Sequence, residues 1–419
     1  MVDRSVAPKF FQPEKFPLPK PEIINLDNGN RFFTLHSGDQ PVIKLEFIFK
    51  AGLRFESFPG IAFFAAKMLT EGTEKLSSIK VSQTLDQYGA FIEIQPGFDY
   101  TNLSIHIPTN HLARIKDVVK EILFHPVFPD NELDLLKQIQ TQQIRVNQQK
   151  NSFVASRLFR SKLFPENPYG HVMDENAIQQ ISQAHVKDFY RKWIKGKFDI
   201  FLTGQFNEDT KKLIVDIIEN SLIPPHEFPK IKTLKEKIFN ECIDKENSLQ
   251  SAIYMGKRCK NKNHPLYPGL LLLNEVFGGY FGSRLMQNIR EEKGYTYSIY
   301  SHIASLKDEA YFLISSDVKK EYRDKTISEI EKEIDIISSK PIGQEELDQA
   351  KNHLKGSVLN TLTNPFAITD KLKNIYFYNL ADDFYDHLFD EIDRIQSDEL
   401  LDLAKNILFN KPLSSVIVG

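Results

Sequence analysis

The feature that most constrains this 419-residue chain is an internal repeat with a long period. Short motifs of the first half return in the second half, in the same order and at nearly one offset. They are E-L-D-x-x-K at 132–137 and 346–351 (offset 214), Phe-Leu-Thr-Gly at 201–204 against Val-Ile-Val-Gly at 416–419 (offset 215), and Pro-Gly at 59–60 and 268–269 (offset 209). Solenoid repeats recur every ~20–50 residues, so this period predicts a duplicated domain of about 200 residues.

Each half mixes strand patterns with helix patterns. Asp27-Asn28-Gly29 lies between two apolar segments and predicts a hairpin, and the alternation over 43–50 predicts a strand with one mostly solvent-facing side. The other predicted elements are strands near 92–94, 103–107 and 198–202, a helix over 60–69 and a long polar helix over 131–150. This mixture predicts an α+β protein of two homologous domains, each a mostly antiparallel sheet packed with helices.

Proline clusters mark the expected boundaries. Four prolines within residues 1–20 predict an extended N-terminal arm, and three prolines in ten residues make 219–232 the expected linker. The two domains are then predicted at 21–218 and 233–419.

Composition excludes several classes of protein. With 53 Lys plus Arg against 56 Asp plus Glu, the net charge of −3 is untypical of a nucleic-acid-binding chain. Two cysteines, Cys242 and Cys259, exclude a disulfide scaffold and a cysteine-based zinc cluster. The chain has no apolar run of the ~18 residues that a membrane span needs, and residues 1–8 have no apolar stretch typical of a signal peptide. We therefore expect no membrane partner and a cytoplasmic location, or a periplasmic one if an upstream signal is missing.

The residues alone offer no self-sufficient catalytic centre. The eleven histidines form no H-x-x-H, H-E-x-x-H or H-x-x-E-H motif, and the chain has no G-x-S-x-G elbow. The glycine-rich segment with Gly278, Gly279 and Gly282 follows a predicted helix and lacks the strand and the Lys-Ser/Thr of a phosphate loop. A turn that exposes its backbone is favoured there over a nucleotide site.

Residues 60–73 resemble the signature helix of the pitrilysin/insulinase-type metallopeptidases, the inverzincin family that includes the mitochondrial processing peptidase. The family pattern is G-x-A-H-x-x-E-H-M-x-x-x-G-T, and its frame is matched at Gly60, Ala62, Met68, Gly72 and Thr73. The resemblance extends over about 20–419. It implies the metallopeptidase LuxS/processing-peptidase-like fold, with the two domains as a clam-shell pair.

The residues that carry the family's chemistry are missing from this helix. Phe63, Ala66 and Lys67 stand where the family has its first histidine, its general-base glutamate and its second histidine, and the third ligand position falls at Gln143. Phenylalanine and alanine cannot bind a metal, the lysine brings positive charge, and a glutamine is a weak ligand. The resemblance therefore implies a degenerate zinc motif and no cofactor in this chain.

A second segment, 274–298, closely resembles the family's C-terminal-domain signature, which carries an arginine and a tyrosine seven residues apart. Here these are Arg290 and Tyr297. In the family they hold the substrate backbone beside the scissile bond. Locally, Arg290 is expected in the last helical turn before Gly294, a natural helix end, and Tyr297 in the strand that follows. The alternative is a solvated helix-end cation and an ordinary strand aromatic.

Some bacterial members of the family act as heterodimers, in which one subunit supplies zinc and the other supplies Arg and Tyr. This chain resembles the second kind. The resemblance implies a non-zinc-binding subunit, inactive alone, that cleaves peptides or unfolded protein together with a homologous partner carrying zinc and an intact H-x-x-E-H. In that pair the partner's zinc would polarise the carbonyl, and Arg290 and Tyr297 would orient it and stabilise the developing charge.

Two alternatives stay open. The chain could be an inert scaffold or peptide-binding subunit, as in the respiratory-chain core subunits that resemble this family. It could also be an active enzyme that uses an unrecognised metal site, which the histidine spacing disfavours.

Overall fold

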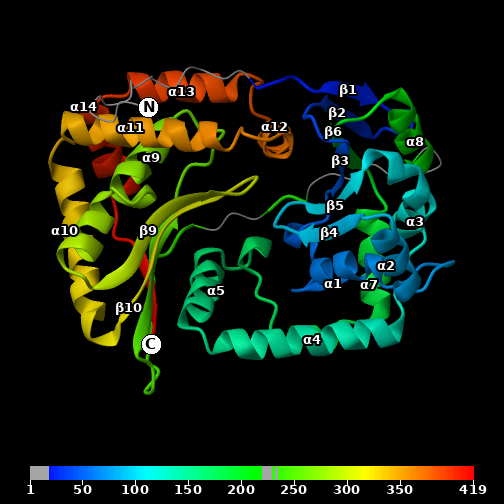
Figure 1. Cartoon of the computed structure of the whole chain (residues 1–419). Helices are drawn as coiled ribbons and strands as arrows, with labels where there is room; N and C mark the ends of the chain where they lie inside the picture. The colour runs from blue at the N-terminus through cyan, green and yellow to red at the C-terminus, as the bar shows by residue number, and fades with distance from the viewer. Residues whose placement is uncertain (1–17, 219–228, 232–234) are drawn as a thin grey trace, which may run out of the picture.

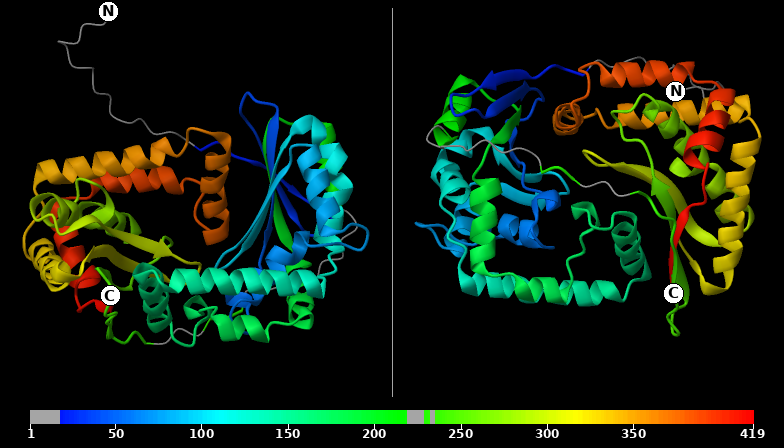
Figure 2. Two further views of the ribbon diagram at one scale, coloured as in Figure 1. Left: turned by 60° about the horizontal axis from the view of Figure 1, so that its bottom comes forward. Right: turned by 180° about the vertical axis from the view of Figure 1, so that it is seen from behind.

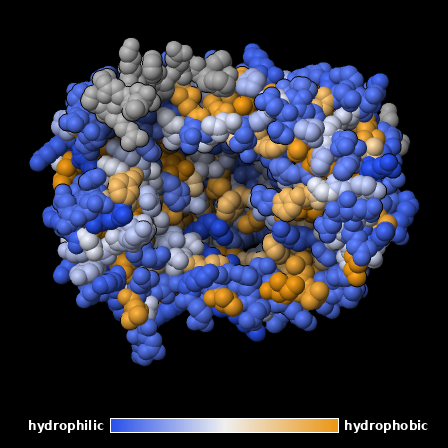
Figure 3. Space-filling view, viewed as in Figure 1, coloured by the Kyte–Doolittle hydropathy of each residue, from blue (hydrophilic) through white to orange (hydrophobic). Residues whose placement is uncertain are grey.

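The computed structural model describes residues 18–218, 229–231 and 235–419. Two halves stand side by side, and the space-filling view is hollowed between them (Figures 1 and 3). The predicted arm and linker fall mostly outside the described residues, so their boundaries stay predictions.

The N-terminal half is built on a six-stranded sheet in the order β1-β2-β6-β3-β5-β4. Its strands are β1 (Glu22–Asn25), β2 (Arg31–His36), β3 (Val42–Phe49), β4 (Phe91–Pro96), β5 (Thr101–Pro108) and β6 (Phe198–Gly204). Its helices are α1 (Ile61–Lys67), α2 (Ser78–Gln87), α3 (Leu112–Phe124), α4 (Asp130–Gln148), α5 (Asn151–Leu163), α6 (Glu175–Gln180), α7 (Gln183–Phe189) and α8 (Glu208–Ile218). Apolar side chains of α1, α3, α7 and α8 form one core with one face of this sheet.

The C-terminal half is built on a five-stranded sheet in the order β7-β11-β8-β10-β9. Its strands are β7 (Asn240–Ile243), β8 (Gln250–Arg258), β9 (Thr296–Ser305), β10 (Ala310–Lys319) and β11 (Ser414–Val418). Its helices are α9 (Tyr267–Asn274), α10 (Arg323–Ser339), α11 (Gln344–Asn360), α12 (Pro365–Tyr378), α13 (Phe384–Arg394) and α14 (Ser397–Leu403). No helix in the described part of the chain combines the length and the apolar character needed to cross a membrane.

The two sheets share one topology, which confirms the predicted duplication. The order β2-β6-β3-β5-β4 corresponds to β7-β11-β8-β10-β9. In each sheet one pair is parallel, β2 with β6 and β7 with β11, and the other neighbouring strands are antiparallel. The repeated motifs lie in matching elements: E-L-D-x-x-K in α4 and α11, and the glycine-ended strands in β6 and β11. The fold is therefore two homologous α+β domains.

The predicted hairpin at the start of the first sheet is confirmed. Strands β1 and β2 pair from Glu22 with Thr34 to Asn25 with Arg31. Between them Gly29 has φ of +83°, and the Asn28 side chain accepts the N–H of Asn30 at 3.1 Å. The Asn-Gly pair supplies the positive φ that this tight turn requires.

The prediction that one side of β3 faces solvent was wrong. Lys44, Glu46 and Ile48 on that side are buried. Helix α12 of the other half covers this face, and the Nζ atom of Lys373 lies 2.7 Å from Oε1 of Glu46. Figure 2 (left) shows the N-terminal sheet with helices of its own half on one side and α12 on the other. Charged residues at every second position of β3 are typical of a solvent-facing side. Here the charges are buried because they form ion pairs inside the molecule.

The covering is reciprocal. Helix α5, from the N-terminal half, packs on β8 and β11 of the C-terminal sheet, where Phe159 shares a core with Ala252 and Val416. Helix α12 packs on the N-terminal sheet, where the Tyr376 ring lies 4.6 Å from that of Phe33. Each half thus lends one helix to the other half's sheet (Figure 1).

Candidate functional site

The signature helix α1 begins at a glycine for a steric reason. Gly60 has φ of +98°, and a Cβ atom there would lie 2.7 Å from Sδ of Met173. Just before it, Oε1 of Glu56 accepts the N–H groups of Gly60 and Ala62, both at 3.0 Å, and so satisfies two free donors of the helix start. Burial raises the pKa of Glu56, and nearby His171 opposes that shift.

The other matched positions of the frame are structural too. Ala62 and Met68 have no exposed surface. Gly72 has φ of +129°, and Oγ1 of Thr73 accepts the N–H of Leu76 at 3.0 Å in the turn that follows the helix. These residues build the helix and its ends, so their presence reports the fold and not the chemistry.

The three positions that would carry chemistry on α1 are filled by other contacts. Phe63 packs edge-on against Phe64 at 5.4 Å, and Ala66 is fully buried. The Nζ atom of Lys67 donates to the carbonyl of Ile94 on β4 at 2.6 Å. An apolar ring, a methyl group and a bonded ammonium offer a cation no lone pair, so zinc does not fit here.

The predicted third position, Gln143, lies on α4 with an exposed side chain. The next residue, Ile144, is buried in the same core as α1. Within residues 18–218, 229–231 and 235–419, no three His, Cys, Asp or Glu side chains are grouped so as to hold a metal ion.

In the C-terminal half, the structure brings Arg290 and Tyr297 together. Arg290 lies in the helical segment η7 (Met286–Glu292), which ends at Gly294 with φ of +63°. Its guanidinium carbon lies 5.3 Å from the centre of the Tyr297 ring and 4.4 Å from that of Phe281. The side chain of Arg290 is 23% exposed, and its Nη1 lies 3.2 Å from Oε1 of Glu291. The predicted helix end and strand positions are confirmed.

Tyr297 sits at an irregularity of its strand. Thr296 pairs with Val318, but Ile299 pairs with Ser316, so Tyr297 and Ser298 together face one residue of β10. Such a β-bulge turns a side chain away from the regular alternation of the strand. Tyr297 is 86% exposed, whereas Ile299 is fully buried.

The bulge is held by side-chain hydroxyls. Oγ1 of Thr296 donates to the carbonyl of Asp317 at 2.7 Å, and Oγ of Ser316 donates to the carbonyl of Ser298 at 2.9 Å. Burial raises the pKa of Asp317. The exposed Tyr297 therefore stands on a fixed backbone.

The glycine-rich segment brings a loop close to the same strand. It begins inside η6 (Glu275–Gly279), which contains Gly278 and Gly279, and Gly282 lies in the turn that follows. A Cβ atom on Gly278 would lie 2.5 Å from Oγ of Ser301 on β9, so only glycine allows this approach. The expected turn is found at Gly282 only, since Gly278 and Gly279 are helical, and a supporting role of this segment in substrate binding stays a prediction.

The base of this loop holds a buried acid. Oε1 of Glu275 lies 2.5 Å from Nδ1 of His353 on α11, and burial raises the pKa of Glu275 while His353 opposes that rise. Arg284 is bonded to Glu346 through two nitrogens at 2.7 and 2.8 Å, which raises the pKa of Arg284. These pairs fix the segment to α11.

Sequence reasoning missed Phe281 and Glu291, the other two neighbours of the Arg290 guanidinium. No local pattern marked Phe281, because its exposure depends on tertiary contacts.

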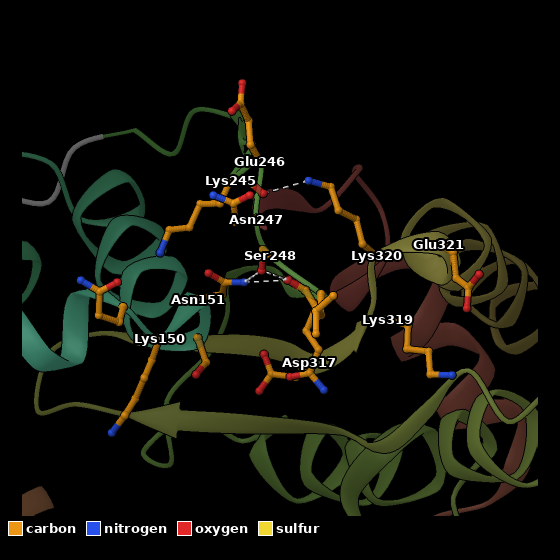
Figure 4. Close-up of a pocket in the computed structure, with 14 residues that line it drawn as sticks. Lys150, Asn151, Lys245, Glu246, Asn247, Ser248, Asp317, Lys319, Lys320 and Glu321 are labelled. Carbon is orange, nitrogen blue, oxygen red and sulfur yellow. Dashed lines mark hydrogen bonds between the residues drawn. The ribbon is translucent and has the colours of Figure 1, made fainter.

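A large pocket lies elsewhere, where the α4–α5 turn meets the β7–β8 loop and the end of β10 (Figure 4). Its volume is about 1180 Å³. Nδ2 of Asn151 bonds Oγ of Ser248 at 2.7 Å, and Nζ of Lys320 bonds the carbonyl of Lys245 at 3.0 Å. None of the predicted site residues lines it, and its charges of both signs select no ligand class.

Comparison with known families decides the identity of the fold and its motifs. Residues 32–173 match the family model described as insulinase (peptidase family M16), and residues 180–354 match the model described as the peptidase M16 inactive domain. The chain belongs to the M16 (insulinase) family of peptidases. The resemblance to the insulinase-type peptidases is confirmed. The match to the insulinase model lies in the N-terminal half, and the match to the inactive-domain model begins at residue 180 and extends into the C-terminal half.

Curated M16 relatives differ in what their names claim. The chain is 26% identical over 362 residues to "Non-peptidase homolog YmxG" of Helicobacter pylori, covering 83% of this chain and 81% of the relative. It is 22% identical over 310 residues to "Uncharacterized zinc protease YmxG" of Bacillus subtilis, covering 72% and 74%. A crystal structure of a "peptidase M16 inactive domain" from Pseudomonas fluorescens has the same fold, with a TM-score of 0.87, 22% identity and coverage of 95% and 98%.

Proposed function

We propose that this M16 chain is the substrate-holding, non-zinc-binding subunit of a two-chain peptidase. A homologous partner would carry the H-x-x-E-H motif and break the peptide bond. Arg290 and Tyr297 of this chain would bind the carbonyl beside the scissile bond. The partner, the peptide substrate and the two roles are parts of the proposal.

One observation carries the proposal: the zinc-helix positions are filled, whereas the Arg290 and Tyr297 positions are open and close together. A guanidinium has five N–H donors, and among the described residues only Glu291 forms an ion pair with it. The remaining donors and the exposed phenol can point at one carbonyl oxygen. Hydrogen bonds of this kind strengthen when negative charge develops on that oxygen.

The experiment uses the complex of this chain with a family member that has an intact H-x-x-E-H. Arg290→Ala removes the charged donor, so kcat/KM for peptide cleavage by the complex should fall ~10²-fold or more. Arg290→Lys should restore little, because an ammonium cannot reproduce the planar fork. The melting temperature and the amount of complex formed should not change.

Arg323→Ala is the matched control. Its side chain is 22% exposed, close to the 23% of Arg290, and it is also paired with acids, Asp244 and Asp324. It lies at the start of α10, so cleavage should stay at the wild-type rate. A wild-type rate in intact complexes of Arg290→Ala would contradict the proposal.

The second candidate is a scaffold or peptide-binding subunit without chemistry. The name of the H. pylori relative, a non-peptidase homolog, favours it. The two candidates differ in one measurement. Purifying the native complex and identifying its members should recover an H-x-x-E-H partner if the first is right.

A further inference from the structure

Phe281 is an exposed aromatic residue held at the tip of a tight turn. It is 55% exposed. It follows Tyr280 in a four-residue turn closed by a hydrogen bond from the N–H of Ser283 to the carbonyl of Tyr280, at 3.1 Å. A large apolar ring exposed to water costs free energy that contact with another apolar group would recover.

The turn is anchored on both sides. The Tyr280 ring stacks on the His353 imidazole, with 4.5 Å between centres and 27° between planes. A Cβ atom on Gly282 would lie 2.7 Å from the Tyr280 ring, so only glycine lets the chain fold back here. Two hydrogen bonds from Arg284 to Glu346 fix the residue that follows the turn. The position of Phe281 is therefore set before any ligand arrives, which lowers the entropy cost of binding.

Phe281, Arg290 and Tyr297 form a continuous surface, which we call the aromatic platform. The guanidinium carbon lies 4.4 Å from one ring centre and 5.3 Å from the other. Rings that cover the faces of a guanidinium leave the N–H donors at its edge able to bond a ligand. The platform thus offers a ligand hydrogen-bond donors of Arg290 next to the apolar ring of Phe281.

We propose that Phe281 determines specificity by contacting an apolar side chain of the peptide, next to the carbonyl that Arg290 binds. This inference rests on the proposed function and adds the class of substrate. In an extended peptide successive residues are ~3.3 Å apart. A carbonyl at the guanidinium therefore places a flanking side chain within reach of a ring centred 4.4 Å away.

Charge selects an apolar side chain over a charged one. Arg290 and Glu291 form an ion pair at 3.2 Å, so together they have no net charge with which to attract a charged side chain. A charged side chain would lose hydration against the Phe281 ring without a compensating partner. An apolar side chain has no such cost and covers the exposed ring.

The test uses two fluorescein-labelled nine-residue peptides that differ only in the residues flanking the central bond, both Leu or both Ser. The complex with the H-x-x-E-H partner should cleave the Leu peptide about tenfold faster in kcat/KM. Phe281→Ser should reduce this preference to about twofold by lowering kcat/KM for the Leu peptide only. Phe281→Leu should keep the preference, which shows that an apolar contact is what matters.

Ile79→Ser on α2 is the control, since Ile79 is a large apolar residue with 68% exposure outside the platform. It should leave the preference unchanged. If Phe281→Ser lowers kcat/KM for both peptides equally, Phe281 only positions Arg290 and the inference is overturned.

Binding to the chain alone separates this inference from the proposed function. Fluorescence anisotropy of the same two peptides should show weaker binding of the Leu peptide to Phe281→Ser than to wild type. If no partner supports cleavage and anisotropy still shows this loss, the proposed function fails and the subsite stands. If Arg290→Ala abolishes cleavage while Phe281→Ser keeps the wild-type preference, the proposed function stands and the subsite fails.

Discussion

The signature helix and the aromatic platform show opposite fates of two motifs in one chain. On α1 the polar group that replaced a metal ligand has found a partner, Lys67 with the carbonyl of Ile94, and the neighbouring Ala66 is sealed in the core. On the platform, rings stay exposed and donors stay available around Arg290. A motif that has lost its chemistry becomes ordinary core. A motif that keeps unsatisfied groups in fixed positions still bears a cost that a ligand can offset.

The largest effect is expected when the zinc-ligand and general-base residues of the family pattern are restored on α1 and α4. Phe63→His, Ala66→Glu, Lys67→His and Gln143→Glu together should lower the free energy of unfolding by at least ~3 kcal/mol, because a carboxylate enters a fully buried position without a partner. Urea unfolding with and without zinc measures this. Zinc that restores wild-type stability at one equivalent would show that α1 had kept its supporting contacts.

A smaller effect is expected from the start of that helix. Gly60→Ala should cost about 2 kcal/mol, because alanine is strained at φ of +98° and its Cβ meets Met173. Gly343→Ala is the control, since Gly343 caps α11 with φ of −62° and nothing lies near its Cβ position. Equal unfolding midpoints for the two variants would contradict the structural explanation of Gly60 in the matched frame.

On the platform, Tyr297→Phe removes one hydroxyl and keeps the ring. We expect kcat/KM of the complex to fall about tenfold, because the hydrogen bond to the substrate is lost. The melting temperature should not change, because Tyr297 is 86% exposed and its hydroxyl bonds none of the residues that the structure describes. Tyr300→Phe, on the same strand and 43% exposed, should leave the rate unchanged. A loss of melting temperature in Tyr297→Phe would mean that the tyrosine serves the fold.

The smallest effect is expected at Lys67. Lys67→Met keeps the stem and removes the bond to the carbonyl of Ile94, so unfolding should become easier by about 1 kcal/mol. Lys80→Met on the exposed side of α2 should change little. If both variants unfold at the same urea concentration, the hydrogen bond of Lys67 to the carbonyl of Ile94 does not stabilise α1.

The sequence predicted the duplicated topology because repeats and strand periods are local patterns. It failed at β3, since the cover over Lys44 and Glu46 comes from α12, more than 300 residues away in the chain. It placed Arg290 near the end of a helix and Tyr297 in a strand, but not the bulge between Thr296 and Ile299, which depends on pairing with β10. Phe281 was missed for the same reason: a residue's exposure is set by tertiary contacts that no short pattern contains.

The exchange of α5 and α12 has a topological consequence. Each sheet has one face covered by its own helices and the other covered partly by a helix that the opposite half donates. The molecule is in this sense a swapped pair folded within a single polypeptide: each half has its own core on one face of its sheet, and the other face is packed by a helix of the opposite half. The two halves are therefore joined at two separate places, where α5 packs on the C-terminal sheet and α12 packs on the N-terminal sheet, so the sheet that carries Tyr297 does not stand alone.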